Sequence, residues 1–402
     1  MTSLSLTGRA EQLGRHAAAF LGFSIPISVV LDNVLLALVA VLWLAGGALM
    51  QKIEIIGASK VALSALALFG MLIAGLSYGT RYPGDGLAFL GKYVDLLFIP
   101  MFITLFRDER TRDLALRWFC AGMVLTFVAA DFAMLGLLAG NPLLPRTPDA
   151  LGAFKQSIPH GLLSAFAAFV FALLAHREGR WPLRILYAAL AIIAVKNVVL
   201  ISVSRTAYLV LVLLAVYFCF ALFRGRKRVL AVLLLAGFFS AIYGSSDTFR
   251  ERVDTVFADS RELRSRLPSR ESVTMRLGWY QRSFDIVRDN PLLGTGTGSF
   301  PRVYSEAIKD PQKARTRNPH NEYLLIAVQT GLVGLGLLLH LFWRQLTLAR
   351  RLASPLEAHL AVGLVFTVAV GCLFNSFLHD HTEGLFYAWF TGLLYAGLRS
   401  EE

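Results

Sequence analysis

Long runs of apolar residues alternate with short polar segments along nearly the whole chain. Each run has roughly the length that a helix needs to cross a bilayer, about 20 residues, or fewer where a helix is broken. The pattern therefore predicts an all-α polytopic integral membrane protein with about twelve transmembrane helices. The predicted segments are 17–31, 34–50, 61–78, 93–106, 118–139, 161–175, 183–201, 206–223, 229–243, 323–343, 357–377 and 384–398.

One polar segment, residues 244–322 between the ninth and tenth predicted helices, is much longer than the others. Apolar residues recur in it at steps of three and four, with one longer gap in the first of two stretches, which predicts two amphipathic helices that lie on the membrane or cap the helix bundle. These residues are Phe249, Val253, Val256, Leu263 and Leu267 in the first helix, and Val273, Leu277, Tyr280, Phe284 and Val287 in the second. We therefore predict a single transmembrane domain over residues 1–402, with a loop subdomain at 244–322.

Composition supports a membrane protein, because 56% of the residues are hydrophobic and only 16% are charged, against about 25% in soluble domains. The net charge of +12 does not indicate nucleic-acid binding, since membrane loops collect Lys and Arg for topological reasons. The three cysteines lie in apolar runs without paired spacing, so neither disulfides nor a zinc site is predicted. The first apolar run lacks a small-residue cleavage site and is predicted to be a retained helix.

The distribution of basic residues predicts the orientation. With both termini in the cytoplasm, the inner segments carry 19 Lys and Arg residues and the short outer segments carry 6. Basic residues favour the cytoplasmic side, and long loops are translocated largely regardless of charge. We therefore predict a multi-pass membrane protein with cytoplasmic termini and an extracytoplasmic loop over residues 244–322.

His320 is the leading candidate for chemistry. It lies in Asn318–Tyr323, where the long loop turns into an apolar helix. The positive end of the helix dipole disfavours an imidazolium, so a neutral, base-competent histidine is expected there. Such a base at the water–lipid boundary can deprotonate a sugar hydroxyl. The simpler interpretation is a polar run that caps a helix.

Other polar groups fall on the same predicted face of the membrane. Arg205 opens the eighth segment, Arg276 shares a helix face with Val273 and Tyr280, and His379-Asp380-His381 precedes the last segment. Each is also compatible with a plain role, as a headgroup anchor, a solvated charge or a polar turn. Lys196 interrupts the seventh segment and indicates either a functional charge or a broken helix end. No second pair of ligands accompanies the histidines, so no metal and no other cofactor is predicted.

The run Gly294-Thr295-Gly296-Thr297-Gly298 follows a predicted helix, whereas nucleotide-binding glycine motifs follow a strand and open a helix. A tight loop with close backbone approach is the better interpretation.

Three motifs in the sequence resemble those of a known protein family. They are Pro319–Leu324 followed by Gly331–Gly334, the run Ser204–Ala207, and the stretch from Arg276 to Phe300 with its Asn-Pro-Leu-Leu-Gly sequence. In order and spacing they resemble the O-antigen ligase/polymerase superfamily of bacterial membrane glycosyltransferases. The resemblance implies transfer of a glycan from undecaprenyl pyrophosphate, and in the ligase branch the acceptor is the lipid A–core oligosaccharide.

The resemblance also implies residue roles. His320 would be the catalytic base, and Arg205 and Arg276 would bind the pyrophosphate. Asp380 matches a C-terminal acidic position loosely, and we add His379, Lys196 and Asn321 as supporting candidates. No carboxylate pair of the glycosidase type is evident, which favours direct, inverting displacement.

Two alternatives stay open. A polymerase of the same superfamily would use the same lipid-linked donor. A secondary transporter would also have about twelve helices, although transporters usually contain internal repeats and polar residues at the membrane midplane. The sequence contains no evident repeat, and its unusual polar residues lie near the outer surface, apart from Lys196.

Overall fold

A computed structural model describes residues 5–79, 85–137, 153–202, 204–245, 250, 254, 273–308, 316–352 and 354–398. In this part of the chain all regular structure is helical, apart from one isolated antiparallel bridge between Leu352 and Leu398. The helices are α1 (Leu6–Ser24), α2 (Val29–Ala45), α3 (Leu49–Ala58), α4 (Lys60–Ala74), α5 (Asp85–Lys92), α6 (Asp95–Leu105), α7 (Glu109–Met134), α8 (Ser157–Arg177), α9 (Trp181–Lys196), the π-helix η1 (Asn197–Ser202), α10 (Arg205–Leu222), α11 (Arg226–Ser245), α13 (Val273–Asp289), α14 (Phe300–Ala307), α15 (Glu322–Ala349), α16 (Pro355–Phe374) and α17 (His381–Tyr395).

Seven helical stretches among the described residues are long and apolar enough to cross a membrane, or eight if the bent pair α2 and α3 forms one span. The all-helical membrane character predicted from the sequence is therefore confirmed. Helices occupy all twelve predicted segments, but several are too short or too polar to span by themselves. The count of twelve spans, the extracytoplasmic loop and the orientation stay predictions.

The first predicted segment, 17–31, is wrong as a single helix. The described helix α1 begins at Leu6, where the Ser5 hydroxyl accepts a hydrogen bond from the Gly8 amide, and it ends at Ser24. The chain then turns through Pro26, and Ser28 caps the start of α2. Proline has no amide hydrogen to continue the helical hydrogen bonds, and serine is a strong N-cap, so these two residues divide the apolar run.

The chain divides into two compact units. The first comprises Met1–Gly46, Asp108–Val256 and Ser354–Val370, and the second comprises Gly47–Arg107, Phe257–Ala353 and Gly371–Glu402. In the first unit α8 is the most deeply buried helix and packs against α9, η1 and α10, while α1 packs against α2 and α7. In the second unit α6 packs against α17, and α15 packs against α4 and α13.

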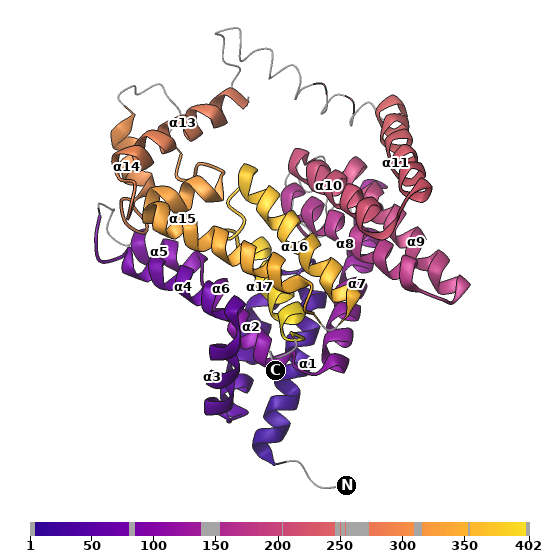
Figure 1. Cartoon of the computed structure of the whole chain (residues 1–402), viewed down its shortest axis with the longest axis horizontal. Helices are drawn as coiled ribbons and strands as arrows, with labels where there is room; N and C mark the ends of the chain where they lie inside the picture. Colours follow the sequence, from indigo (N-terminus) through magenta and orange to yellow (C-terminus); the bar gives the residue numbers. More distant parts are fainter. Residues whose placement is uncertain are drawn as a thin grey trace. The chain divides into compact units, whose positions relative to one another are not determined.

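The predicted loop contributes folded structure to the second unit. Helices α13 and α14 lie against the first half of α15 (Figure 1). Their apolar residues join those of α5 and α15 in one buried cluster, formed by Phe89, Ile286, Val287, Phe300, Tyr304, Leu325, Ala327 and Val328. The second predicted loop helix is thus present as α13 and packs on α15. The first, over 249–267, lies outside the described residues.

The predicted apolar stripe of α13 is only partly correct. Val287 is buried, but Leu277 and Phe284 are exposed, and the face that packs inward carries Trp279, Ser283 and Ile286 as well as Val287. The two faces are adjacent on the helix, so the repeat alone does not distinguish the one that meets the protein.

The glycine-rich loop after α13 fills a break in α15. Gly331 has a non-helical backbone (φ +66°) in the middle of α15. The Thr295 and Gly296 amides donate to the Val328 and Gln329 carbonyls, both at 2.8 Å, and the Leu332 amide donates to the Pro291 carbonyl at 2.7 Å. The loop therefore supplies the hydrogen bonds that the broken helix lacks.

Only glycine fits at the two points of closest approach in this interlock. A Cβ on Gly331 would lie 2.1 Å from the Leu292 carbonyl oxygen, and a Cβ on Gly294 would lie 2.6 Å from the Gly331 nitrogen. Both glycines also have positive φ, which residues with a side chain adopt at a cost. The predicted close-approach loop is confirmed, and its partner is α15.

Candidate functional site

His320 lies in the turn that leads into α15, with a left-handed backbone (φ +53°) that is uncommon for a residue with a side chain. The turn is held in place by side-chain hydrogen bonds. The Asn318 carboxamide oxygen accepts from the His320 amide at 2.8 Å and from the Ser376 hydroxyl at 2.7 Å. Left-handed residues that the surrounding structure fixes in this way are frequent at functional sites.

One face of α13 lies against His320. Arg276, Trp279 and Tyr280 are three and four residues apart, so they share this face. The Trp279 and His320 rings have centroids 5.2 Å apart at 33°, and the Tyr280 hydroxyl lies 3.1 Å from the His320 carbonyl oxygen. The same hydroxyl lies 3.1 Å from the Leu373 carbonyl oxygen at the end of α16.

The surroundings favour a neutral imidazole. Burial lowers the pKa of His320 below 6.5, and the positive charge of Arg276 lowers it further. The sequence also predicted a lowered pKa for His320, but from the helix dipole. In the structure the causes are burial and the neighbouring Arg276 cation. Within the described residues, Arg276 is half-buried and has no carboxylate partner.

The start of α15 is fixed by its own polar residues. Asn321 is the N-cap, since its carboxamide oxygen accepts from the Leu324 amide at 3.0 Å, and its nitrogen donates to the Leu373 carbonyl at 3.0 Å. The fully buried Glu322 accepts from the Tyr93 hydroxyl at 2.6 Å and from the Leu378 amide at 3.0 Å. These bonds attach the His320 turn to α5–α6 and to the segment before α17.

His379 is buried between two aromatic rings, with its centroid 4.9 Å from that of Phe89 and 5.6 Å from that of Tyr93. Neither ring nitrogen has a hydrogen-bond partner among the described residues. Burial, followed by the charge of Lys92, lowers the pKa of His379 to about 3. His379 therefore packs as a neutral ring at neutral pH.

Asp380 and His381 begin α17. Asp380 is exposed at the N-cap position, and His381 Nδ1 lies 3.6 Å from an Asp95 oxygen. The structure thus brings His320, Arg276, Asn321, His379 and Asp380 into the second unit, around the start of α15 and the start of α17. No group of three His, Cys, Asp or Glu side chains suited to holding a metal occurs in the described part of the chain.

Arg205 and Lys196 belong to the first unit. Arg205 is half-buried at the first position of α10, directly after Ser204, whose hydroxyl caps the helix. Lys196 is the last residue of α9, where the helix changes to the π-helix η1. The predicted irregularity at Lys196 is therefore confirmed, and its ammonium forms an ion pair with Asp131 of α7.

Several residues of this arrangement were not predicted. Trp279, Tyr93, Glu322 and Asn318 contact or support the His320 turn, and Asp131 pairs with Lys196. An intramembrane carboxylate such as Asp131 is a signal in itself. Glu322 and Asn318 flank His320, but their partners lie too far away in sequence to be identified from spacing.

Comparisons with known proteins agree with the motifs. A search of curated proteins found no match. Residues 196–339 match the family model described as O-Antigen ligase. The match includes Arg205, α13, the glycine-rich loop, His320 and most of α15. The match supports the O-antigen ligase superfamily for these residues.

Proposed function

We propose that the protein is an O-antigen ligase, which transfers a glycan from undecaprenyl pyrophosphate to the lipid A–core oligosaccharide at the periplasmic face of a Gram-negative inner membrane. The family match supports the ligase/polymerase class. One observation carries the assignment of the site: a half-buried His320, its pKa lowered, lies against a helix face that contains Arg276.

In the proposed reaction a hydroxyl oxygen of the acceptor sugar attacks the anomeric carbon of the donor glycan. His320 takes the hydroxyl proton, a bond forms between that oxygen and the anomeric carbon, and the bond from the anomeric carbon to the phosphate oxygen breaks. The electron pair leaves with undecaprenyl pyrophosphate. A positioned general base of this kind is worth roughly 10²–10⁴ in rate. Direct displacement inverts the anomeric configuration.

The leaving pyrophosphate gains negative charge, so cationic donors stabilise the transition state. In this proposal Arg205 and Arg276 provide them, because a guanidinium is always charged and offers two parallel hydrogen bonds to phosphate oxygens. The position of Arg205 at the start of α10 suits this role, since the amides of a helix N-terminus also favour anions. No cofactor is required.

The supporting residues differ in their proposed roles. Asn321 orients the His320 turn through its cap and its bond to Leu373. Asp380, exposed and near Lys92, is available to the acceptor. His379 fills space behind the turn, and Lys196 with Asp131 holds the end of α9. Neither of the last two is proposed to touch the reacting atoms.

A reconstituted reaction tests the proposal. Purified protein is mixed with a glycan on undecaprenyl pyrophosphate and with lipid A–core, a chelator is added, and the products are separated on a gel. Glycan transferred to lipid A–core is the expected result. A donor glycan that lengthens without transfer would make the protein a polymerase. An unchanged donor and acceptor, with a folded protein, would overturn the enzyme assignment and favour a transporter.

A further inference from the structure

A cavity of about 300 Å³ lies in the second unit, away from the turn that holds His320. Several of its lining residues lie where five helices begin or end. Ser59 and Lys60 mark the junction of α3 and α4, Arg107 follows α6, Arg351 follows α15, and Tyr395 ends α17. The remaining lining residues are apolar, namely Ile55, Ala58, Ile103, Leu348 and Leu398.

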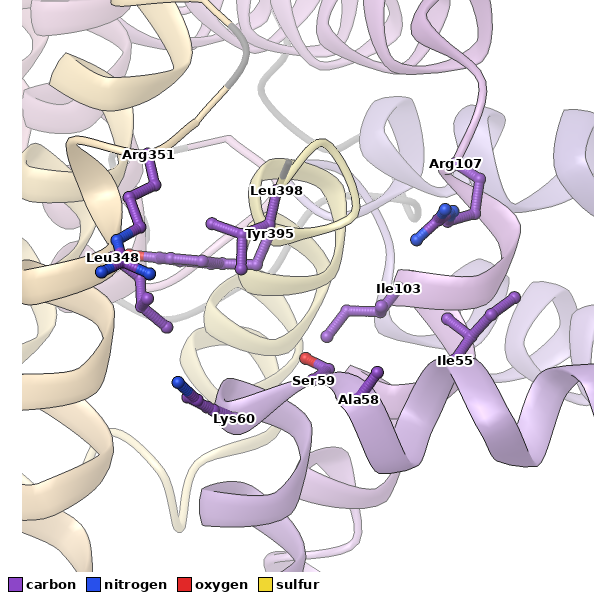
Figure 2. Close-up of a pocket in the computed structure, with 10 residues that line it drawn as sticks. All are labelled: Ile55, Ala58, Ser59, Lys60, Ile103, Arg107, Leu348, Arg351, Tyr395 and Leu398. Atoms are coloured by element: carbon purple, nitrogen blue, oxygen red, sulfur yellow. The ribbon is translucent and has the colours of Figure 1, made fainter. Parts of the chain in front are cut away.

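The charged side chains that line this cavity are all positive. Lys60, Arg107 and Arg351 line it, and no acidic residue is among the ten lining residues (Figure 2). All three residues are exposed, and each also takes part in a further interaction within the protein. In Figure 2 the Tyr395 ring lies between Arg351 and Arg107, and Lys60 is on the Arg351 side.

The start of α4 adds to the positive potential. Ser59 caps α4 through a 3.3 Å bond from the Ala62 amide, and Lys60 is the first residue of the helix. The amides of this first turn carry partial positive charge. The cavity therefore combines three side-chain cations with a helix N-terminus and apolar walls.

The cavity and His320 lie at opposite ends of one helix. His320 directly precedes α15, whereas Leu348 and Arg351 lie at and just beyond its last turn. Beyond the break at Gly331, residues 332–349 of α15 alone are about 27 Å long, close to the roughly 30 Å of the hydrocarbon core. The cavity is thus at the membrane face opposite His320, which the distribution of basic residues predicts to be cytoplasmic.

We propose that this cavity binds the phosphate headgroup of an anionic phospholipid from the leaflet opposite His320. Basic pockets between transmembrane helices on the cytoplasmic side suit such headgroups. The volume is at the lower end of the range for ligand pockets, about 300–1,000 Å³, and so suits a headgroup better than a glycan. The apolar walls suit the first carbons of the acyl chains.

Lipid binding to the full-length protein in detergent tests this site. The probes are phosphatidylglycerol, phosphatidylcholine with the same acyl chains, and inorganic phosphate. Affinity is measured by native mass spectrometry and by the rise in thermal unfolding temperature. Wild-type protein should bind phosphatidylglycerol at least tenfold more tightly than phosphatidylcholine. Equal affinity for the two lipids would overturn the proposal, as would inorganic phosphate stabilising the protein as well as phosphatidylglycerol does.

The variants Lys60→Gln, Arg107→Gln and Arg351→Gln should each weaken phosphatidylglycerol binding about fivefold, the value expected for one basic residue near an anionic surface. Arg350→Gln is the matched control, because Arg350 is an exposed neighbour that does not line the cavity. It should stay within twofold of wild type. An equal loss in Arg350→Gln and Arg351→Gln would show general surface attraction and contradict a specific site.

Discussion

The two candidate regions are held in place by different kinds of interaction. The turn around His320, in the second unit, is fixed by hydrogen bonds of Asn318 with Ser376, of Asn321 with Leu373 and of the Tyr280 hydroxyl, and the Glu322 carboxyl group anchors the start of α15 beside it. The approach to Arg205, in the first unit, contains a π-helix and the Lys196–Asp131 ion pair. A base must stay neutral, and a facing carboxylate would raise its pKa. A permanently charged arginine has no such restriction.

Substitution of His320 should have the largest effect. His320→Gln removes the proposed base, so transfer should fall by roughly 10²–10⁴, while the protein still folds and inserts. The rate is measured in the reconstituted reaction. His340→Gln, in the other half of α15, is the control and should keep the wild-type rate. Normal transfer by His320→Gln would exclude the base assignment.

The interlock between the glycine-rich loop and α15 should be nearly as sensitive. Gly331→Ala places a Cβ 2.1 Å from the Leu292 carbonyl at a positive φ, and we expect a loss of about 3 kcal/mol in stability. Thermal unfolding in detergent measures it. Gly336→Ala in the same helix has open space around its Cβ and should not destabilise the protein. Equal stability of both variants would mean that the interlock does not stabilise the fold.

Arg205→Lys tests the region in the first unit. A lysine keeps the charge but cannot offer two parallel hydrogen bonds, so transfer should fall about 10- to 100-fold, as for the loss of one charge-assisted bond. The donor KM and kcat are both measured. Arg184→Lys, an exposed basic residue on α9, is the control. Wild-type turnover in Arg205→Lys would leave Arg205 as a headgroup anchor.

Arg276→Gln should alter the dependence on pH. The base is active when deprotonated, and burial and Arg276 both lower the pKa of His320, so wild-type transfer should persist as the pH falls to 6.5. Loss of the cation raises the pKa, and transfer should then decline at a higher pH. The profile of kcat/KM reports this shift. Arg288→Gln on the same helix should leave the profile unchanged. An unshifted profile in Arg276→Gln would show that the charge does not act on His320.

Tyr280→Phe should have the smallest effect. It removes the hydroxyl between the His320 and Leu373 carbonyls, which is worth about 0.5–1.5 kcal/mol. Thermal unfolding and the transfer rate should both decrease slightly. A loss of transfer as large as that in His320→Gln would give Tyr280 a direct part in the reaction, contrary to our proposal.

The sequence predicted the helices, because apolar runs and the polar residues at their ends are local signals. The roles of His320, Arg205 and Arg276 stay predictions. It predicted that the glycine run is a close-approach loop but not that it meets Gly331, since nothing near the loop indicates its partner. The same limit explains why the Lys196–Asp131 pair was missed. Pro26 and Ser28 are local signals that segment 17–31 is divided, but the prediction followed the long apolar run instead.

The break at Gly331 has a consequence for how the chain is assembled. An open break in a helix is costly inside a membrane, because lipid offers no partners for its backbone groups. The partners of this break, residues 291–298, precede Gly331, and Gly75, whose carbonyl accepts from the Thr297 amide, precedes them all. Synthesis proceeds from the N-terminus. The ribosome therefore synthesises Gly331 after all the residues that bond to this break, so its partners are already present when α15 emerges.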